Sequence, residues 1–171
     1  MNFDQHIAKI PEFPKPGITF YDIGPMLEDP AVARQAVDTL AELAAQYEPD
    51  LIVGLDARGF LFSLPVALAL NIGTVMVRKA GKLPGAVVER SYALEYGEAT
   101  LAIQTERDLH GKRVVVIDDL LATGGTVSAA VSLIEQVGAT VAASLFVVEL
   151  TGLNGRARLS GDVHALQQYE F

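Results

Sequence analysis

Apolar residues recur along the chain at helical spacing in some segments and in short unbroken runs in others. Over residues 31–47 the apolar positions return every three or four residues, which predicts an amphipathic helix. Asp29-Pro30 in front of it reads as an N-cap followed by proline at the first helical position. Residues 51–55 form a short apolar run typical of a buried strand, and a second helix is expected over 60–70.

The same alternation continues to the end of the chain. Apolar runs at 74–77, 113–117 and 141–148 predict three further strands. A helical stripe predicts a helix ending near Val137, with Gly138 as its left-handed cap. Strands that alternate with helices predict an α/β fold, with a mostly parallel central sheet flanked by helices. Because ligands of such sheets bind beyond the carboxyl ends of the strands, a site is expected there.

The length predicts one domain over residues 1–171. Half of the 171 residues are hydrophobic, which excludes a disordered chain, and the absence of cysteine excludes disulfides, thiolate zinc sites and a cysteine nucleophile. The uncharged run 59–77 is long enough to span a membrane, but Pro65 and the Asn-Ile-Gly at 71–73 interrupt it. With no secretory signal at the start, we expect a cytoplasmic protein without a membrane partner.

The charge distribution points to a small anionic ligand. Thirteen basic against 21 acidic residues give a net charge of −8, which argues against a nucleic-acid partner. Residues 57–90 are the exception, because they contain one acidic residue, Glu89, and five basic ones: Arg58, Arg78, Lys79, Lys82 and Arg90. One positive window in an acidic chain suits an anionic small molecule.

The most informative stretch runs from 114 to 126. Four apolar residues lead into Asp118 and Asp119, and a loop with two glycines between threonines then opens a predicted helix. The N–H groups of such a turn favour a phosphate, while paired carboxylates suit ribose hydroxyls or a ligand that brings its own Mg²⁺. Each feature alone is more often structural, but their order predicts a ribose-phosphate site. Neither a P-loop nor a GxGxxG motif is present.

These residues resemble the phosphoribosyltransferases, and within that family the enzymes that use adenine. The resemblance covers essentially the whole chain, through the segments 13–17, 54–60, 78–85, 91–97, 118–126 and 148–151. It implies a fold with a small hood, built from the N-terminal segment and the last part of the chain, together with a mobile lid and a homodimer. It also implies adenine and phosphoribosyl pyrophosphate as substrates and Mg²⁺ carried by the latter.

The resemblance also implies roles for individual residues. Asp118 and Asp119 would hold the ribose hydroxyls, and the 5′-phosphate would be bound by Ala122, Thr123, Gly124, Gly125 and Thr126. The pyrophosphate would be held, and its departure assisted, by Ala57, Arg58, Arg78, Lys79 and Lys82.

The base would be bound under the N-terminal segment. Phe20 and Leu150 correspond to an apolar pair that sandwiches adenine, and the backbone around Thr19, Phe20 and Tyr21 would bond its edge. Many members have arginine where this chain has Tyr21, so a side-chain or a backbone contact stays open at that position.

Residues 83–104 have two interpretations. Their pattern alone predicts an exposed hairpin, whereas the resemblance implies the mobile lid, with Glu95 as the carboxylate that handles the proton of the base. The three histidines have no metal-ligand spacing, so no metal site built by the protein is expected.

The implied reaction is transfer of 5-phosphoribosyl from phosphoribosyl pyrophosphate to N9 of adenine, which gives AMP and pyrophosphate. A 6-oxopurine or orotate transferase and a non-catalytic regulator that senses phosphoribosyl pyrophosphate stay open as alternatives. Ala122 favours adenine, because the 6-oxopurine enzymes typically have aspartate there. The chain has no room for the DNA-binding domain that such regulators usually carry.

Overall fold

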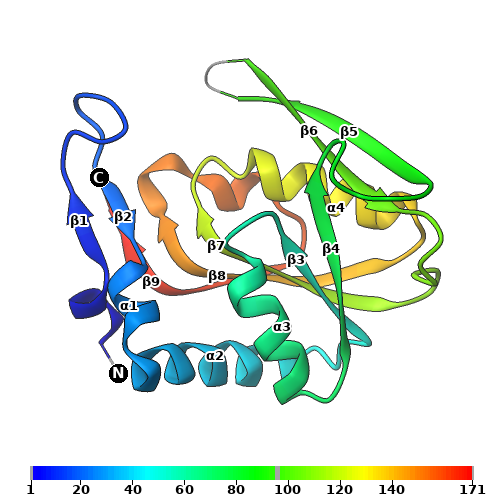
Figure 1. The fold of residues 1–171 in the computed structure, drawn as a ribbon, viewed down its shortest axis with the longest axis horizontal. Helices are drawn as coiled ribbons and strands as arrows, with labels where there is room; N and C mark the ends of the chain where they lie inside the picture. Colours follow the sequence, from blue (N-terminus) through cyan, green and yellow to red (C-terminus); the bar gives the residue numbers. More distant parts are fainter. Residues whose placement is uncertain (1, 95–96, 171) are drawn as a thin grey trace.

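A seven-stranded sheet forms the centre of the computed structural model, which describes residues 2–94 and 97–170 (Figure 1). Its strands are ordered β5-β6-β4-β3-β7-β8-β9. The bounds are β3 (Leu51–Leu55), β4 (Gly73–Lys79), β5 (Val87–Ala93), β6 (Glu98–Gln104), β7 (Arg113–Leu121), β8 (Thr140–Leu150) and β9 (Asp162–Tyr169). Neighbours from β4 to β9 pair in parallel, and only β5 and β6 run antiparallel to their neighbours. The mostly parallel sheet expected from the sequence is confirmed.

Helices cover both faces of this sheet (Figure 1). The short α1 (Gly24–Glu28), α2 (Pro30–Ala45) and α3 (Phe60–Ala69) lie on one face, and α4 (Gly125–Gln136) lies on the other. Asp29 caps α2 as predicted, accepting the N–H groups of Ala31 and Val32.

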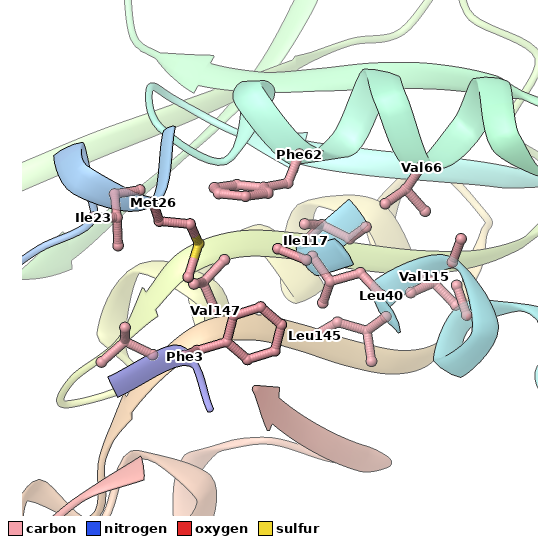
Figure 2. Close-up of a cluster of buried hydrophobic side chains, with 14 of the residues drawn as sticks. Phe3, Ile23, Met26, Leu40, Phe62, Val66, Val115, Ile117, Leu145 and Val147 are labelled. Carbon is pink, nitrogen blue, oxygen red and sulfur yellow. The ribbon is translucent and has the colours of Figure 1, made fainter. Parts of the chain in front are cut away.

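Strand β7 divides its side chains between two buried cores. Val115 and Ile117 pack with α2 and α3 in the cluster drawn in Figure 2, which also contains Leu40 and Phe62. Val114 and Val116 point to the opposite face and pack with α4. Period-two alternation in a strand covered on both faces explains why its sequence is a continuous apolar run.

The structure corrects two predicted boundaries near the expected site. Strand β7 does not end at Ile117, because its pairing with β8 continues through Asp118 and Leu120. The two acidic residues therefore lie inside the strand and not after it. Helix α4 begins at Gly125, inside the glycine loop that was expected to precede it, so the second half of that loop is already helical. Gly138 has a φ of 90°, as its predicted cap role requires.

The N-terminal segment and the last strand lie together, as expected for the hood (Figure 1). Strands β1 (Ala8–Ile10) and β2 (Phe20–Asp22) form a separate antiparallel pair. The rings of Tyr21 and Tyr169 stack with centroids 4.1 Å apart, and Tyr169 donates a hydrogen bond of 2.8 Å to Asp4. Strand β9, which was not predicted, joins the main sheet and links the hood to it.

Residues 83–104 contain the hairpin that their pattern predicts. Strand β5 pairs with β6, and β6 pairs in turn with β4, so the hairpin extends the main sheet. Glu95 lies outside the described residues. In the described part of the chain, no helix is long and apolar enough to cross a membrane.

Candidate active site

A cavity of about 670 Å³ opens where β3 and β7 end. Its walls come from the turn after β3 (residues 56–58), from Lys79, from residues 118–127, and from the hairpin through Tyr92, Leu94, Ala99 and Leu101. The predicted residues Ala57, Arg58 and Lys79 thus face one space together with both aspartates and loop 122–126. These groups come from separate parts of the sequence, so the fold brings them together.

Loop 122–126 is held in shape by direct backbone packing. Gly124 has a φ of 81°, and a Cβ on it would lie 2.5 Å from the carbonyl oxygen of Gly155. A Cβ on Gly155 would lie 2.3 Å from the carbonyl oxygen of Ala122, so both positions need glycine. Thr126 Oγ1 donates to the hydroxyl of Tyr92 at 3.1 Å, which joins the loop to the hairpin. The loop opens α4, whose first N–H groups have no partner within the helix.

The two aspartates differ in their surroundings. Asp118 Oδ1 accepts the N–H of Asp119 at 2.9 Å, and Asp119 Oδ2 lies 2.5 Å from Nε of Arg58. Burial and the charge of Asp119 raise the pKa of the Asp118 carboxyl well above its usual range. The Arg58 guanidinium opposes this rise to a smaller extent. One carboxylate is thus paired with a cation, and its neighbour resists ionisation.

The turn after β3 packs closely against β7. A Cβ on Gly59 would lie 2.6 Å from the carbonyl oxygen of Leu55 and 2.9 Å from Asp118 Oδ1. Glycine at this position therefore lets the start of α3 approach the acid pair. The peptide bond between Asp56 and Ala57 is cis. Arg58 Cζ lies 5.5 Å from the ring centroid of Phe20, so this guanidinium lies between Asp119 and a predicted base-binding residue.

Two of the remaining predicted cations lie close to the carboxylate of Asp56. Arg78 Nε lies 3.3 Å and Lys82 Nζ 3.9 Å from Asp56 Oδ2, and neither residue lines the cavity, whereas Lys79 does. Sequence reasoning gave Asp56 no role, because an acid at the end of a strand carries no signal of the cations that will surround it.

The predicted base-binding residues lie outside the cavity walls. Phe20 is half-buried and meets the edge of Phe13 at a centroid distance of 5.4 Å, and Thr19 is exposed. Leu150 is buried in the hydrophobic cluster against which Tyr21 packs. Among the described residues, Phe20 is not part of that cluster. In the structure, Leu150 therefore lies near Tyr21, whereas Phe20 lies near Arg58.

The chain is similar to known proteins over nearly its whole length. Residues 25–162 match the family model described as a phosphoribosyl transferase domain. The adenine phosphoribosyltransferase of Rhodospirillum centenum is 50% identical over 170 residues, which are 99% of each chain. That of Desulfitobacterium hafniense is 51% identical over 99% of this chain and 98% of its own. The chain belongs to the adenine phosphoribosyltransferase family.

Solved structures of this family agree with the fold. The adenine phosphoribosyltransferase of Thermoanaerobacter pseudethanolicus is 43% identical, with a TM-score of 0.94 over 98% of both chains. That of Saccharomyces cerevisiae, solved in complex with an imino-altritol bisphosphate and adenine, is 40% identical, with a TM-score of 0.91 over 96% of both chains. The matched part thus covers nearly all of the chain.

One buried ion pair in this member of the adenine phosphoribosyltransferase family was not predicted from the sequence. Glu149 is 2% exposed and forms a bidentate pair with Arg156, with Nε to Oε1 at 2.6 Å and Nη2 to Oε2 at 2.7 Å. Although burial alone would raise the pKa of Glu149, hydrogen bonds from Arg156 and Gln168 lower it. This pair fixes the loop that carries Gly155, and through Gly155 it supports loop 122–126.

Proposed function

We propose that this protein transfers 5-phosphoribosyl from phosphoribosyl pyrophosphate to N9 of adenine and releases AMP and pyrophosphate. The observation that carries the proposal is the common cavity of loop 122–126, the acid pair and Arg58. The substrate has a phosphate, a ribose and a pyrophosphate in that order. The cavity offers backbone N–H groups, then two carboxylates, then a guanidinium.

Loop 122–126 anchors the 5′-phosphate. The start of α4 supplies N–H groups and the positive end of the helix dipole, and the hydroxyls of Thr123 and Thr126 add donors. Because this phosphate takes no part in the bond changes, its binding energy fixes the position of the reacting sugar carbon.

Asp118 and Asp119 accept hydrogen bonds from the ribose hydroxyls. The negative charge of the acid pair, which Asp119 carries beside Arg58, stabilises the sugar as positive charge develops at its first carbon. Bringing the hydroxyls against Asp119 requires the Arg58 guanidinium to share or leave its place on that carboxylate. The same movement would direct Arg58 toward the leaving pyrophosphate.

The negative charge that develops on the departing pyrophosphate is stabilised by Arg58, by the N–H groups around Ala57, and by the cations Arg78, Lys79 and Lys82. The carboxylate oxygens of Asp118 and Asp119, which line the cavity, fit an Mg²⁺ that arrives on the substrate phosphates. When bound, Mg²⁺ neutralises phosphate charge beside Asp118 and Asp119.

Adenine is placed by the hood. The Tyr21 ring is stacked on Tyr169, which supports a contact to the base through the backbone of 19–21 and not through the Tyr21 side chain. Phe20 and Leu150 supply the apolar surfaces of the base site. Glu95 handles the proton of the base; Leu94, which precedes it in the sequence, lines the cavity. Glu95→Gln is expected to lower kcat by roughly 10²–10⁴-fold.

We also propose that two copies pair through α3. Leu61, Leu64 and Leu68 form a helical stripe whose exposed fractions are 50%, 51% and 68%. A groove of about 660 Å³ beside the stripe is lined mainly by apolar residues of α2 and α3. Isolated exposed leucines are ordinary, but a continuous stripe beside an apolar groove is typical of an interface.

The proposed reaction is tested by mixing the protein with phosphoribosyl pyrophosphate, Mg²⁺ and each purine in turn. We expect AMP and pyrophosphate in one-to-one amounts with adenine. Binding of phosphoribosyl pyrophosphate without turnover of any base would instead indicate the regulator. IMP or GMP as the main product would indicate a 6-oxopurine transferase. The cytoplasmic location and the single domain over residues 1–171 stay predictions.

A further inference from the structure

We propose that Asp56 is a positioning residue for pyrophosphate binding, which holds in place two cationic side chains and the backbone of a third basic residue. These cations, Arg78, Lys79 and Lys82, lie at and after the end of β4 and are called the basic arm below. Asp56 is the first residue after β3, and its side chain is only 3% exposed. The inference rests on the proposed function, because it assigns pyrophosphate as the ligand of the arm.

One carboxylate oxygen contacts every member of the basic arm. Asp56 Oδ2 accepts a hydrogen bond from Arg78 Nε at 3.3 Å and from the backbone N–H of Lys79 at 3.4 Å. Lys82 Nζ lies 3.9 Å from the same oxygen. The backbone N–H of Asp56 also donates to Val77 at 3.0 Å, so the turn is fastened to β4 on both sides.

Pairing of β4 with β6 fixes the backbone of Arg78 and Lys79, whereas the side chains of the arm have few other contacts among the described residues. Arg78 Nη1 reaches the carbonyl oxygen of Lys82 at 3.4 Å, and Arg78 Cζ lies 5.9 Å from the ring centroid of Phe60. Without the carboxylate, the cations would repel one another and sample many rotamers. A ligand would then have to order them as it binds, which weakens its affinity.

A simple charge effect and a positioning effect predict opposite results. If Asp56 acted only through its charge, neutralising it would remove repulsion from an anionic ligand and tighten binding. If it positions the arm, neutralising it weakens binding of any ligand that carries pyrophosphate. AMP has no pyrophosphate, and its phosphate is expected in loop 122–126, so its affinity should not depend on Asp56.

The test measures binding of phosphoribosyl pyrophosphate and of AMP to Asp56→Asn by calorimetry with Mg²⁺. We expect the Kd for phosphoribosyl pyrophosphate to rise about tenfold, the size of a lost charge-assisted hydrogen bond, and the Kd for AMP to stay within about twofold. In the steady state, KM for phosphoribosyl pyrophosphate should rise by a larger factor than kcat falls. Glu89→Gln is the matched control, since Glu89 is an exposed acid on β5 whose strand is separated from β4 by β6. It should not weaken either ligand.

A second set of variants separates positioning from other roles. In the background of Arg78→Ala, Asp56→Asn should cost less than it does alone, because its main partner is gone. Asp56→Ser repeats the measurement with a smaller neutral side chain, in case the amide disturbs the fold. Retained or tighter binding of phosphoribosyl pyrophosphate in both Asp56 variants would overturn the inference.

Two other results would also overturn it. Equal weakening of AMP and phosphoribosyl pyrophosphate would show a general effect on the fold. A raised Mg²⁺ requirement that persists in the background of Arg78→Ala would show a metal ligand and not a positioning residue. If the wild-type protein neither binds phosphoribosyl pyrophosphate nor forms AMP, the proposed function itself fails, which the wild-type measurement reveals before any variant is compared.

Discussion

Arg58 and Asp119 form an ion pair that joins the turn after β3 to the end of β7, with 2.5 Å between Nε and Oδ2. The side chain of Arg58 is 47% exposed, whereas that of Asp119 is 10% exposed. The pair thus has an exposed partner and a buried one, and ligand binding is expected to move the exposed arginine. Both the proposed ribose contact and the proposed pyrophosphate contact depend on this exchange.

Neutralising Asp119, the buried partner, should impair catalysis more than folding. Asp119→Asn removes the charge that accepts from a ribose hydroxyl, and we expect kcat/KM to fall by the equivalent of about 1.5–3 kcal/mol. Asp162→Asn is the control, because this acid lies at the far edge of the sheet, where it accepts from Tyr47. An unchanged kcat/KM for Asp119→Asn, measured by initial rates, would leave the acid pair with a purely structural role.

Asp118 should make the protein less stable as the pH rises. Its folded-state pKa is raised above the ordinary value of 3.8, so the unfolded chain loses this proton first. The stabilising contribution is therefore present below pH 3.8 and is lost as the pH rises through the folded-state pKa.

Asp118→Asn has no such titration, and it should be more stable than the wild type near neutral pH although it is less active. Thermal unfolding of both proteins from about pH 4 to about pH 8 checks this. A variant that is less stable than the wild type across the whole range would contradict the assigned cause.

Gly155 should matter to phosphate binding although it does not line the cavity. Gly155→Ala would place a Cβ 2.3 Å from the Ala122 carbonyl and displace loop 122–126. We expect AMP affinity to fall roughly 10–100-fold, because phosphate donors tolerate little displacement. Gly73→Ala is the matched control, since its Cβ would meet only the flexible end of Leu51. Equal AMP affinity in the two variants would show that this packing does not shape the loop.

The parts of the molecule that the sequence predicts are those with local signals. The run 113–117, the acid pair and the glycine loop follow one another within a single stretch, so strand, site and helix could be inferred together. The predicted end of strand β7 was wrong, because charged residues usually mark the end of a buried strand. Here the backbone ladder with β8 continues through Asp118, and a ladder needs only N–H and carbonyl groups.

The missed features depend on segments that meet only in the fold. Nothing in one sequence pairs Gly124 with Gly155, or Asp56 with Lys82. Strand β9 was missed because it lies at the sheet edge, where its residues are only partly buried and polar side chains are tolerated. Its role in holding the hood through Tyr169 is a tertiary contact without a local pattern.

Pairing of two copies through α3 gives a further measurable expectation. The double variant Leu64→Glu and Leu68→Glu should convert a dimer into a monomer in light scattering at micromolar concentration, because charges would enter an apolar interface. Leu153→Glu, at another exposed leucine, should leave the mass unchanged. A monomeric wild type would contradict the proposed pairing outright.

The choice of base tests the central claim most directly. Ala122 lines the cavity, and it offers no carboxylate to a base. Initial rates with saturating phosphoribosyl pyrophosphate and Mg²⁺ would give kcat/KM for adenine, hypoxanthine and guanine. Adenine should exceed both others by at least about 10³-fold, since a site that hydrogen-bonds one base leaves polar groups unpaired with another. A kcat/KM for hypoxanthine or guanine that equals the adenine value would contradict the assignment.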